Sequence, residues 1–154
     1  MTTPLHLVVR RSAPEGSEGP ATELSLTVPS SLDYVGEAVE LVACHCLYGV
    51  LPPRKVQFNL RTAFAEALAN AIIYGNRLDP AKLVRVRVEL GRDAVRIHVT
   101  DDGVGFDPTA VPDPTVPENL EREDGRGLFV LRHLVDHVTF NEKGNDICLT
   151  LRAG

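Results

Sequence analysis

Two neighbouring stretches alternate apolar and polar residues with a period of two, and this pattern restricts the fold more than any other. They are LVRVRVEL, residues 83–90, and AVRIHVTD, residues 94–101, separated by the turn residues Gly-Arg-Asp. Successive side chains of a strand point to opposite faces, so the pattern predicts an antiparallel hairpin with one buried face and one face in water. The wet face should present Arg85, Arg87, Arg96 and His98.

The rest of the chain predicts further strands and helices around this hairpin. Strands are expected at 5–10, 23–28, 137–140 and 146–151, the first two forming a hairpin over 5–28. Helices are expected from the Pro29-Ser30-Ser31 cap to about residue 48, from 54 to 74 and from 127 to about 137. The second helix should end at Gly75-Asn76, because both residue types tolerate left-handed backbone. This order predicts a single α+β domain over 1–154, with about three helices on one face of a mixed, mostly antiparallel sheet.

Composition excludes several classes of protein. The chain has 154 residues, a formal net charge of -5 and 24% charged residues, which is typical of a globular protein and not of a nucleic-acid binder. It has neither an apolar run long enough for a membrane helix nor a secretory signal, so we expect a cytoplasmic location. The three cysteines, two of them in Cys44-His45-Cys46, match neither a disulfide framework nor paired zinc ligands, and buried or incidental thiols are the simpler interpretation.

The stretch EALANAIIYGN, residues 66–76, places a polar pair among small and apolar residues at the end of the second predicted helix. Helical periodicity puts Glu66 and Asn70 together, beside Ala63 and Tyr74, on the side away from the face that should dock on the sheet. That docking face is Leu60, Phe64, Leu68, Ala71 and Ile72. A solvated surface would explain the pair, but the alanines around it favour a side that faces another group.

The stretch VTDDGVGF, residues 99–106, follows the second strand of the hairpin. Strand parity places Asp101 on the inward face with Val99, where a carboxylate needs a partner. Gly103 and Gly105 remove side chains at the point where another group must approach the backbone. An ordinary Asp-Gly turn is the alternative interpretation.

The third stretch is DGRGLFVLRHL, residues 124–134, which follows a long proline-rich and acidic connection over 106–124. Connections of this length without a periodic pattern are often active-site lids. Glycines around Arg126 at the start of a helix are compatible with an anion cradle, because free N–H groups and the positive helix end favour phosphate. A flexible helix cap is the alternative interpretation, because a single Gly-x-Gly before a helix is a weak signal for an anion site. The sequence has neither a P-loop nor a dinucleotide-binding glycine pattern here.

Taken together and in this order, the three stretches resemble the N, G1 and G2 boxes of the GHKL (histidine kinase-like, Bergerat-fold) ATPases. EALANAIIYGN, DDGVGFDP and GRGLFVLRHLVD look most like the single-domain anti-sigma regulatory factors that are serine-protein kinases, over roughly residues 30–152. The resemblance implies a two-layer α/β sandwich with an ATP lid at about 106–126.

The resemblance also implies roles for individual residues. Asn70 would hold Mg2+ against the ATP phosphates, and Glu66 would be the catalytic carboxylate that orients and deprotonates a serine hydroxyl. Asp101 would accept the amino group of adenine. Arg122 or Arg126 would contact the polyphosphate. The other nucleotide-binding positions would be Gly103, Gly105, Gly125, Gly127 and Leu128. The chain departs from the family pattern at Tyr74, where many members have His.

By resemblance, the chain is an anti-sigma factor that binds a sigma factor and, with Mg-ATP, phosphorylates a STAS-type antagonist protein. A homodimer is expected, without direct contact to nucleic acid or membrane. One alternative is a nucleotide-gated binding protein that transfers no phosphate. Another is the catalytic domain of a histidine kinase, which the absence of a long helical pair with a phosphoacceptor His disfavours.

Overall fold

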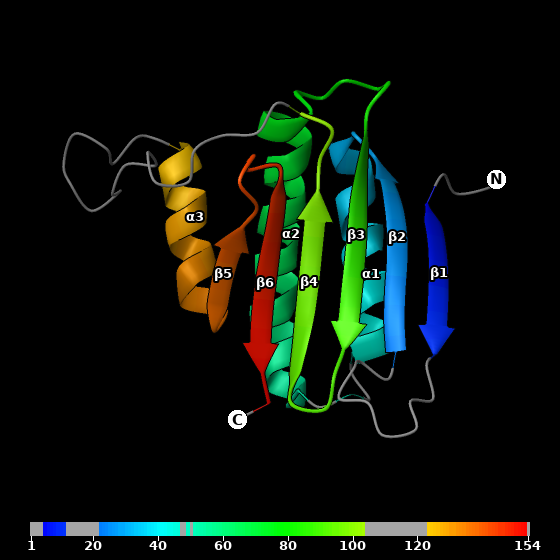
Figure 1. Cartoon of the computed structure of the whole chain (residues 1–154), viewed down its shortest axis with the longest axis vertical. Coiled ribbons are helices and arrows are strands. Elements are labelled where there is room, and N and C mark those ends of the chain that lie inside the picture. Colours follow the sequence, from blue (N-terminus) through cyan, green and yellow to red (C-terminus); the bar gives the residue numbers. More distant parts are fainter. Residues whose placement is uncertain (1–4, 12–21, 47–48, 50, 104–122, 154) are drawn as a thin grey trace.

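The computed structural model describes residues 5–11, 22–46, 49, 51–103 and 123–153 (Figure 1). The strands are β1 (His6–Arg11), β2 (Thr22–Pro29), β3 (Leu83–Leu90), β4 (Ala94–Thr100), β5 (His137–Phe140) and β6 (Asp146–Arg152). The helices are α1 (Val35–Cys46), α2 (Arg61–Asn70) and α3 (Glu123–Leu134). A 3-10 turn, Leu32–Tyr34, precedes α1, and π-wound segments at Lys55–Leu60 and Ala71–Gly75 extend α2 at both ends.

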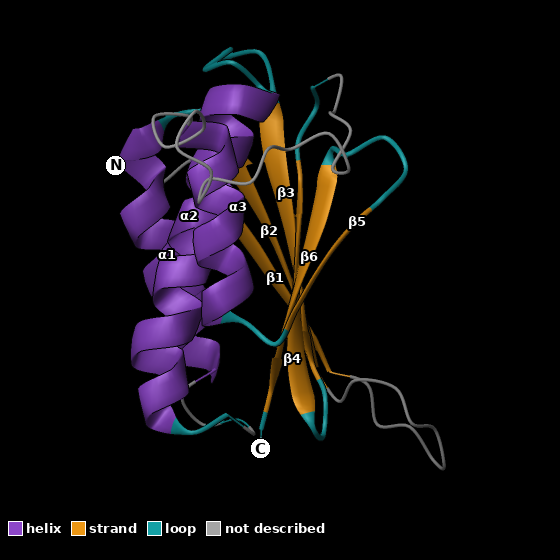
Figure 2. Cartoon of the chain, turned by 90° about the vertical axis from the view of Figure 1, so that its left-hand side faces the viewer, coloured by secondary structure: helices purple, strands orange, loops and turns teal. Residues whose placement is uncertain are grey.

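The six strands form one sheet in the order β1-β2-β3-β4-β6-β5, and every pair in it is antiparallel. Helices α1, α2 and α3 lie on one face of the sheet, and within the described residues no helix covers the other face (Figure 2). The predicted α+β two-layer architecture is therefore confirmed. The sheet is antiparallel throughout these six strands, whereas a mixed, mostly antiparallel sheet was predicted.

The core lies between the sheet and the helices. Alternate residues of the central strands are buried there, including Val86 of β3 and Ile97 of β4. Helix α2 and its two π-wound extensions together form one long helix over residues 55–75. Every residue of its predicted docking face is also buried: Leu60, Phe64, Leu68, Ala71 and Ile72. On the opposite face Arg85, Arg87 and Arg96 are exposed and His98 is partly covered, so the predicted wet face is confirmed.

Helix α2 is the middle helix of its layer and packs against both α1 and α3. This position explains the small residues around the polar pair. Ala63 and Ala67 are buried, because neighbouring helices approach closely over them. Glu66 and Asn70 are half-buried. The side of the helix that bears them is therefore not a simple solvated surface.

The long helix ends at Gly75, as predicted, but the prediction that Gly75 and Asn76 supply the left-handed backbone is wrong. Asn76 has φ -89°, and the left-handed residues are Arg77 at φ 53° and Leu78 at φ 59°. The amide of Leu78 donates to the carbonyl of Ile72 at 2.8 Å, which closes the turn. Left-handed conformation costs a non-glycine residue about 1–2 kcal/mol. Just before this turn, the Asn76 side chain is held by hydrogen bonds to Ser30, Leu83 and Asp102.

The third helix also differs from the prediction, which placed it from Gly127 to about residue 137. It begins at Glu123 and ends at Leu134. The last residues of the predicted lid, 123–126, are therefore helical. The remainder of the lid lies outside the described residues. Helix α1 ends at Cys46, just before the predicted end near residue 48, which also lies outside them.

A polar cluster joins the start of the long helix to the C-terminal end of α3 and to β6. Lys55 Nζ donates to Asp136 Oδ2 at 2.9 Å and to the carbonyl of Arg152 at 2.6 Å. The amide of Arg152 donates to the same Asp136 oxygen at 2.7 Å. Asn59 Nδ2 donates to the carbonyl of Leu134 at 2.9 Å. These bonds fix the end of α3 that is remote from the glycine motif.

Replacing Asp136 by Asn should make the protein less stable at neutral pH, with a difference that shrinks in acid. The amide of Arg152, together with Lys55, lowers the pKa of Asp136 from 3.8. A lowered folded-state pKa contributes stability above the unfolded-state value, and this is lost as pH falls below about 4 through the folded-state pKa. For a partly exposed group we expect a loss of about 0.5–1 kcal/mol at pH 7.

Urea unfolding of both proteins between pH 7 and pH 3 measures this difference. Asp93→Asn, at an exposed position in the turn between β3 and β4, is the control. A difference between wild type and Asp136→Asn that stays constant across this range would contradict the assigned role of the carboxylate.

Candidate functional site

The three sequence stretches converge at one end of the molecule (Figure 1). The end of the long helix, the end of β4 and the beginning of α3 are all at this end of the molecule, although they come from distant parts of the chain. The described parts of the three segments thus lie at the same end of the fold, and the site that they would form stays a prediction.

Glu66 and Asn70 lie on successive turns of α2 and contact each other. Asn70 Nδ2 donates to Glu66 Oε1 at 3.3 Å. The amide nitrogen is thus turned toward the carboxylate, which leaves the amide oxygen for another partner. An amide oxygen is a suitable ligand for Mg2+, which prefers oxygen donors and keeps several waters.

Asp101 follows β4 and is buried, with 9% of its surface exposed. Its Oδ1 accepts the amide of Gly103 at 2.8 Å. Desolvation raises the pKa of this carboxyl above 3.8, and the Gly103 amide opposes that shift. The expected inward orientation of Asp101 is therefore confirmed. A buried carboxylate with one oxygen bound by a neighbouring amide still has acceptor capacity for a ligand.

Gly75 and Gly103 are required by close packing around Asp101. A Cβ atom added to Gly75 would overlap the Asp101 carboxyl group, and one added to Gly103 would overlap the carbonyl group of Gly75. The end of the helix and the turn after β4 thus meet backbone to backbone. The close approach at Gly103 is predictable from the sequence, whereas Gly75 is predicted there only to end the helix.

Asn76 is a second residue that sequence analysis missed, and it is fully buried. Its Oδ1 accepts the amide of Asp102 at 2.7 Å. Its Nδ2 donates to Ser30 Oγ at 2.8 Å and to the carbonyl of Leu83 at 3.0 Å. The signal in the sequence was an Asn directly after the helix, but its partners are too distant along the chain to be predicted from local pattern.

Asp102 completes the connection between these segments. Its carboxylate accepts the amide of Leu83 at 3.0 Å and a guanidinium nitrogen of Arg85 at 2.6 Å. The Leu83 amide, followed by Arg85, lowers the pKa of Asp102. The two adjacent carboxylates therefore differ in environment: Asp101 is directed to the buried interior, and Asp102 clamps the start of β3.

The glycine motif of the third stretch lies inside α3 and not in front of it. Gly125 is in the first turn, where backbone N–H groups have no helical partner, and Gly127 is beyond it. The anion cradle expected from both glycines is thus reduced to the first turn. The side chains of Arg126 and Leu128 lie outside the described residues, as do Gly105 and Arg122 entirely.

A nucleotide with its metal ion fits this chemistry. The buried Asp101 carboxylate offers an acceptor for an amino group, the glycine contact provides a wall without side chains, and the start of α3 offers N–H groups to an anion. Within the described ranges there is no group of three His, Cys, Asp or Glu side chains that would bind a metal by themselves. Metal binding here would depend on Asn70 together with ligand oxygens.

The cysteines offer no alternative site. All three are free thiols, with Cys44 exposed and Cys46 buried. Burial raises the pKa of Cys46 to about 12, so this thiol is inert as a nucleophile or ligand at neutral pH.

Among the described helices, none is long and apolar enough to cross a membrane.

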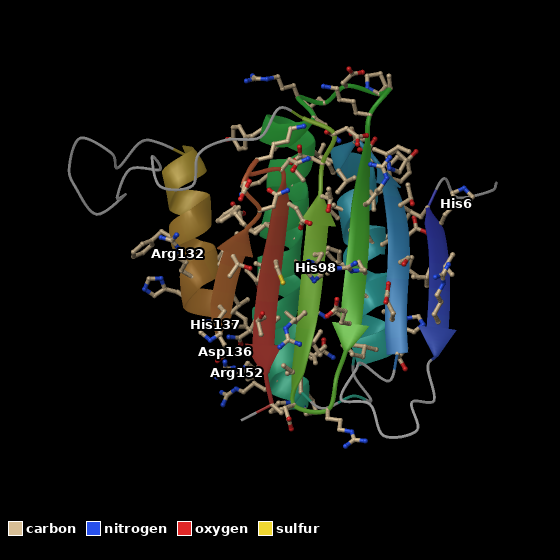
Figure 3. All side chains as sticks on the ribbon, viewed as in Figure 1. His6, His98, Arg132, Asp136, His137 and Arg152 are labelled. Carbon is tan, nitrogen blue, oxygen red and sulfur yellow. The ribbon has the colours of Figure 1, made fainter. Side chains whose placement is uncertain are left out.

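The uncovered face of the sheet contains a shallow cavity of about 260 Å³, remote from the helix layer and lined partly by Arg85, Arg87 and His98. Figure 3 shows His98 near the centre of this face. Its arginines are already paired, Arg85 with Asp102 at 2.6 Å and Arg87 with Glu89 at 3.4 Å. The cavity therefore lacks the uncompensated charge of an anion site.

Comparisons with known proteins identify the family of the chain. Residues 28–151 match the histidine kinase-like ATPase domain. An anti-sigma F factor of Clostridium beijerinckii is 34% identical over 114 residues, covering 71% of this chain and 79% of that protein. One of Oceanobacillus iheyensis is 30% identical over 135 residues, covering 83% and 90%. One of Geobacillus thermodenitrificans is 33% identical over 89 residues, covering 56% and 60%.

Proposed function

Because this chain belongs to the histidine kinase-like ATPase family, we propose that it is an anti-sigma factor that binds Mg-ATP and phosphorylates a protein on serine. The observation on which the proposal rests is the arrangement at the end of the long helix. There the contacting pair Glu66 and Asn70 precedes the close packing of Gly75 and Gly103 around the buried Asp101 carboxylate. The relatives named anti-sigma F factor support the regulatory role.

Asp101 selects the base in this proposal. Its carboxylate accepts a hydrogen bond from the amino group of adenine, which compensates its burial. A guanine base would present a carbonyl oxygen to the same carboxylate, and two acceptors would face each other. Gly75 and Gly103 keep this carboxylate at the wall of the pocket, because any side chain at either position would displace it.

Glu66 and Asn70 act at the phosphates. The Asn70 amide oxygen would be the protein ligand for Mg2+, and the ion would supply neutralisation of charge on the phosphate oxygens. Glu66 orients the serine hydroxyl and accepts its proton while the serine oxygen bonds to the γ-phosphorus and ADP leaves. Positioning and charge neutralisation supply most of the rate enhancement in phosphoryl transfer, so a carboxylate one helical turn from the metal ligand is suitably placed.

The proposed partners follow from the family resemblance. The protein would bind a sigma factor and hold it inactive, and it would phosphorylate a STAS-domain antagonist that displaces the sigma factor when unphosphorylated. We propose a homodimer that acts in the cytoplasm. Nucleotide and phosphorylation would together decide which partner is bound.

A kinase assay tests the enzymatic part. The purified chain is incubated with Mg-ATP labelled at the γ-phosphate and a candidate STAS-domain protein, and phosphoserine is identified by mass spectrometry. We expect one phosphorylated serine on the STAS protein and none when Mg2+ is removed with EDTA. Binding of ATP without any transfer to the STAS proteins of the source organism would contradict kinase activity and favour a nucleotide-gated binding protein.

Replacing Asp101 by Asn should weaken ATP binding by about 1–3 kcal/mol, because the amide would face the adenine amino group donor to donor. The same amide would suit the carbonyl of inosine triphosphate, so the preference between the two nucleotides should shift toward inosine. Calorimetric titration with both nucleotides measures this. Asp33→Asn, at an exposed position before α1, is the matched control and should change neither affinity.

Acid should affect the wild-type affinity in a defined direction. Burial raises the pKa of Asp101, so its carboxylate is protonated at a higher pH than an ordinary aspartate. As the pH is lowered, ATP affinity should therefore begin to fall before the pH reaches 3.8, the ordinary pKa of aspartate. The Asp101→Asn variant should lack this dependence. Equal pH profiles for the two proteins would count against the assigned pocket.

A further inference from the structure

Asn76 is a fully buried polar residue to which the proposed reaction gives no role. Its side-chain amide is nevertheless bound on every side, at distances of 2.7 to 3.0 Å, to segments that meet beside Asp101. Buried polar groups are retained where their hydrogen bonds are complete, and a complete network of this kind specifies a single local structure.

The partners of Asn76 fix the orientation of its amide group. Ser30 Oγ donates to the carbonyl of Lys82 at 2.8 Å, so it receives the Asn76 N–H group as an acceptor. The carbonyl of Leu83 can only accept, and the amide of Asp102 can only donate. Rotating the amide by 180° would place acceptors against acceptors and a donor against a donor. Asn76 is thereby locked between the ends of β2 and β4 and the start of β3.

The group that Asn76 Oδ1 binds belongs to the peptide bond that follows Asp101. The N–H of this peptide, on Asp102, donates to Asn76 at 2.7 Å. Its C=O, on Asp101, accepts Asn145 Nδ2 at 3.1 Å. The peptide plane is thus held from both sides, by residues of two different turns. The orientation of this peptide plane determines the direction of the adjoining Asp101 side chain. The side-chain amides of Asn76 and Asn145 therefore orient the Asp101 carboxylate.

We propose that Asn76 is a positioning residue for Asp101 and that base selection depends on it. This inference rests on the proposed function, in which Asp101 accepts the adenine amino group. Small displacements of a group that contacts a ligand have large effects, because hydrogen bonds weaken steeply with angle and distance. Without the hydrogen bond from the Asp102 amide to Asn76, Asp101 would stay at the end of β4, but its carboxylate would be free to rotate away from the base.

A merely structural role would give a different result. The end of β4 has other attachments, since the amide of Asp101 donates to the carbonyl of Asn145 at 2.9 Å and the amide of Leu83 donates to Asp102 at 3.0 Å. Losing Asn76 should therefore not detach the strand. A variant that only lowered stability would lose affinity for all purine nucleotides by the same factor. A variant with a misoriented Asp101 carboxylate would lose more affinity for nucleotides that carry the amino group than for those that lack it.

The test compares ATP with purine riboside triphosphate, which lacks the amino group. In wild type we expect ATP to bind at least about fivefold more tightly. In Asn76→Ala this ratio should fall to near one. Asn59→Ala is the matched control, because it also removes an Asn whose amide donates to a carbonyl distant along the chain, that of Leu134 at 2.9 Å. It should lower the melting temperature but leave the ratio unchanged.

A milder pair of variants addresses the case in which Asn76→Ala does not fold. Ser30→Ala removes one partner of Asn76, and Ser30→Thr restores the hydroxyl. We expect Ser30→Ala to lower the ratio and to speed hydrogen exchange of the Asp102 amide measured by NMR. Ser30→Thr should return both toward wild type.

The outcomes separate this inference from the function on which it rests. A wild-type ratio near one means that Asp101 does not read the amino group, and both proposals fail. A high wild-type ratio that persists in Ser30→Ala, and in Asn76→Ala where it folds, overturns the positioning role alone. A ratio lowered in Ser30→Ala and restored in Ser30→Thr, with Asn59→Ala unchanged, supports it.

Discussion

Replacing Glu66 by Gln should reduce phosphoryl transfer at least about 100-fold while ATP binds almost as before, because a general base contributes about 10²–10⁴ to rate. Gln has the length of Glu and keeps an oxygen for Asn70 Nδ2, whose bond to Glu66 is 3.3 Å long in the native protein. The amide cannot accept the serine proton. Single-turnover transfer from Mg-ATP to the STAS protein measures the chemical step, and calorimetry measures binding.

Two comparisons give this result its meaning. Glu37→Gln, an exposed position in the first turn of α1, should leave transfer unchanged. Asn70→Ala should lose both transfer and metal-dependent nucleotide binding, because the proposed metal ligand is removed. Undiminished transfer by Glu66→Gln would remove Glu66 from the catalytic role. Normal regulation in cells by a variant without transfer would favour the nucleotide-gated binding protein.

Replacing Gly103 by Ala should abolish measurable ATP binding at ordinary concentrations and destabilise the fold by about 1–3 kcal/mol, as overpacking does. The new methyl group would overlap the Gly75 carbonyl group and press on the Asp101 carboxylate. Neither the helix end nor the turn can move without breaking hydrogen bonds of Asn76 or Asp102. Denaturant unfolding and nucleotide titration measure the two effects.

Gly36→Ala is the matched control for this substitution. A Cβ at Gly36 has nothing within 4 Å, and the residue is exposed in α1. The methyl group should therefore stabilise the protein by about 0.5–1 kcal/mol through helix propensity and leave ATP affinity unchanged. Tight ATP binding by Gly103→Ala would show that the nucleotide lies elsewhere.

The strands and the sidedness of the sheet were predictable because each strand repeats a period of two over several residues. In β3 and β4 every Val and Ile at alternate positions is buried, and the arginines between them are exposed. The long helix was predicted for the same reason, since its apolar residues follow one face. Periodic patterns average over many residues, so single exceptions do not disturb them.

Helix ends depended on interactions that local sequence does not contain. Gly75 and Asn76 looked like a left-handed terminus, but their actual partners are Asp101, Asp102 and Ser30, far along the chain. The start of α3 was placed too late because Gly125 and Gly127 are poor helix residues. Acidic residues at Glu123 and Asp124 favour the first turn through the helix dipole, which was the better signal.

The hydrogen bonds that surround the Asp101 peptide join residues separated by 26, 44 and 46 positions along the chain. An unfolded or partly folded chain therefore has no version of this pocket, and a nucleotide that occupies it binds the folded state alone. At ATP concentrations 100 times the dissociation constant, such binding adds about 2.7 kcal/mol to the free energy of unfolding. If the proposed function holds, cellular ATP would thus also stabilise this protein against unfolding and proteolysis.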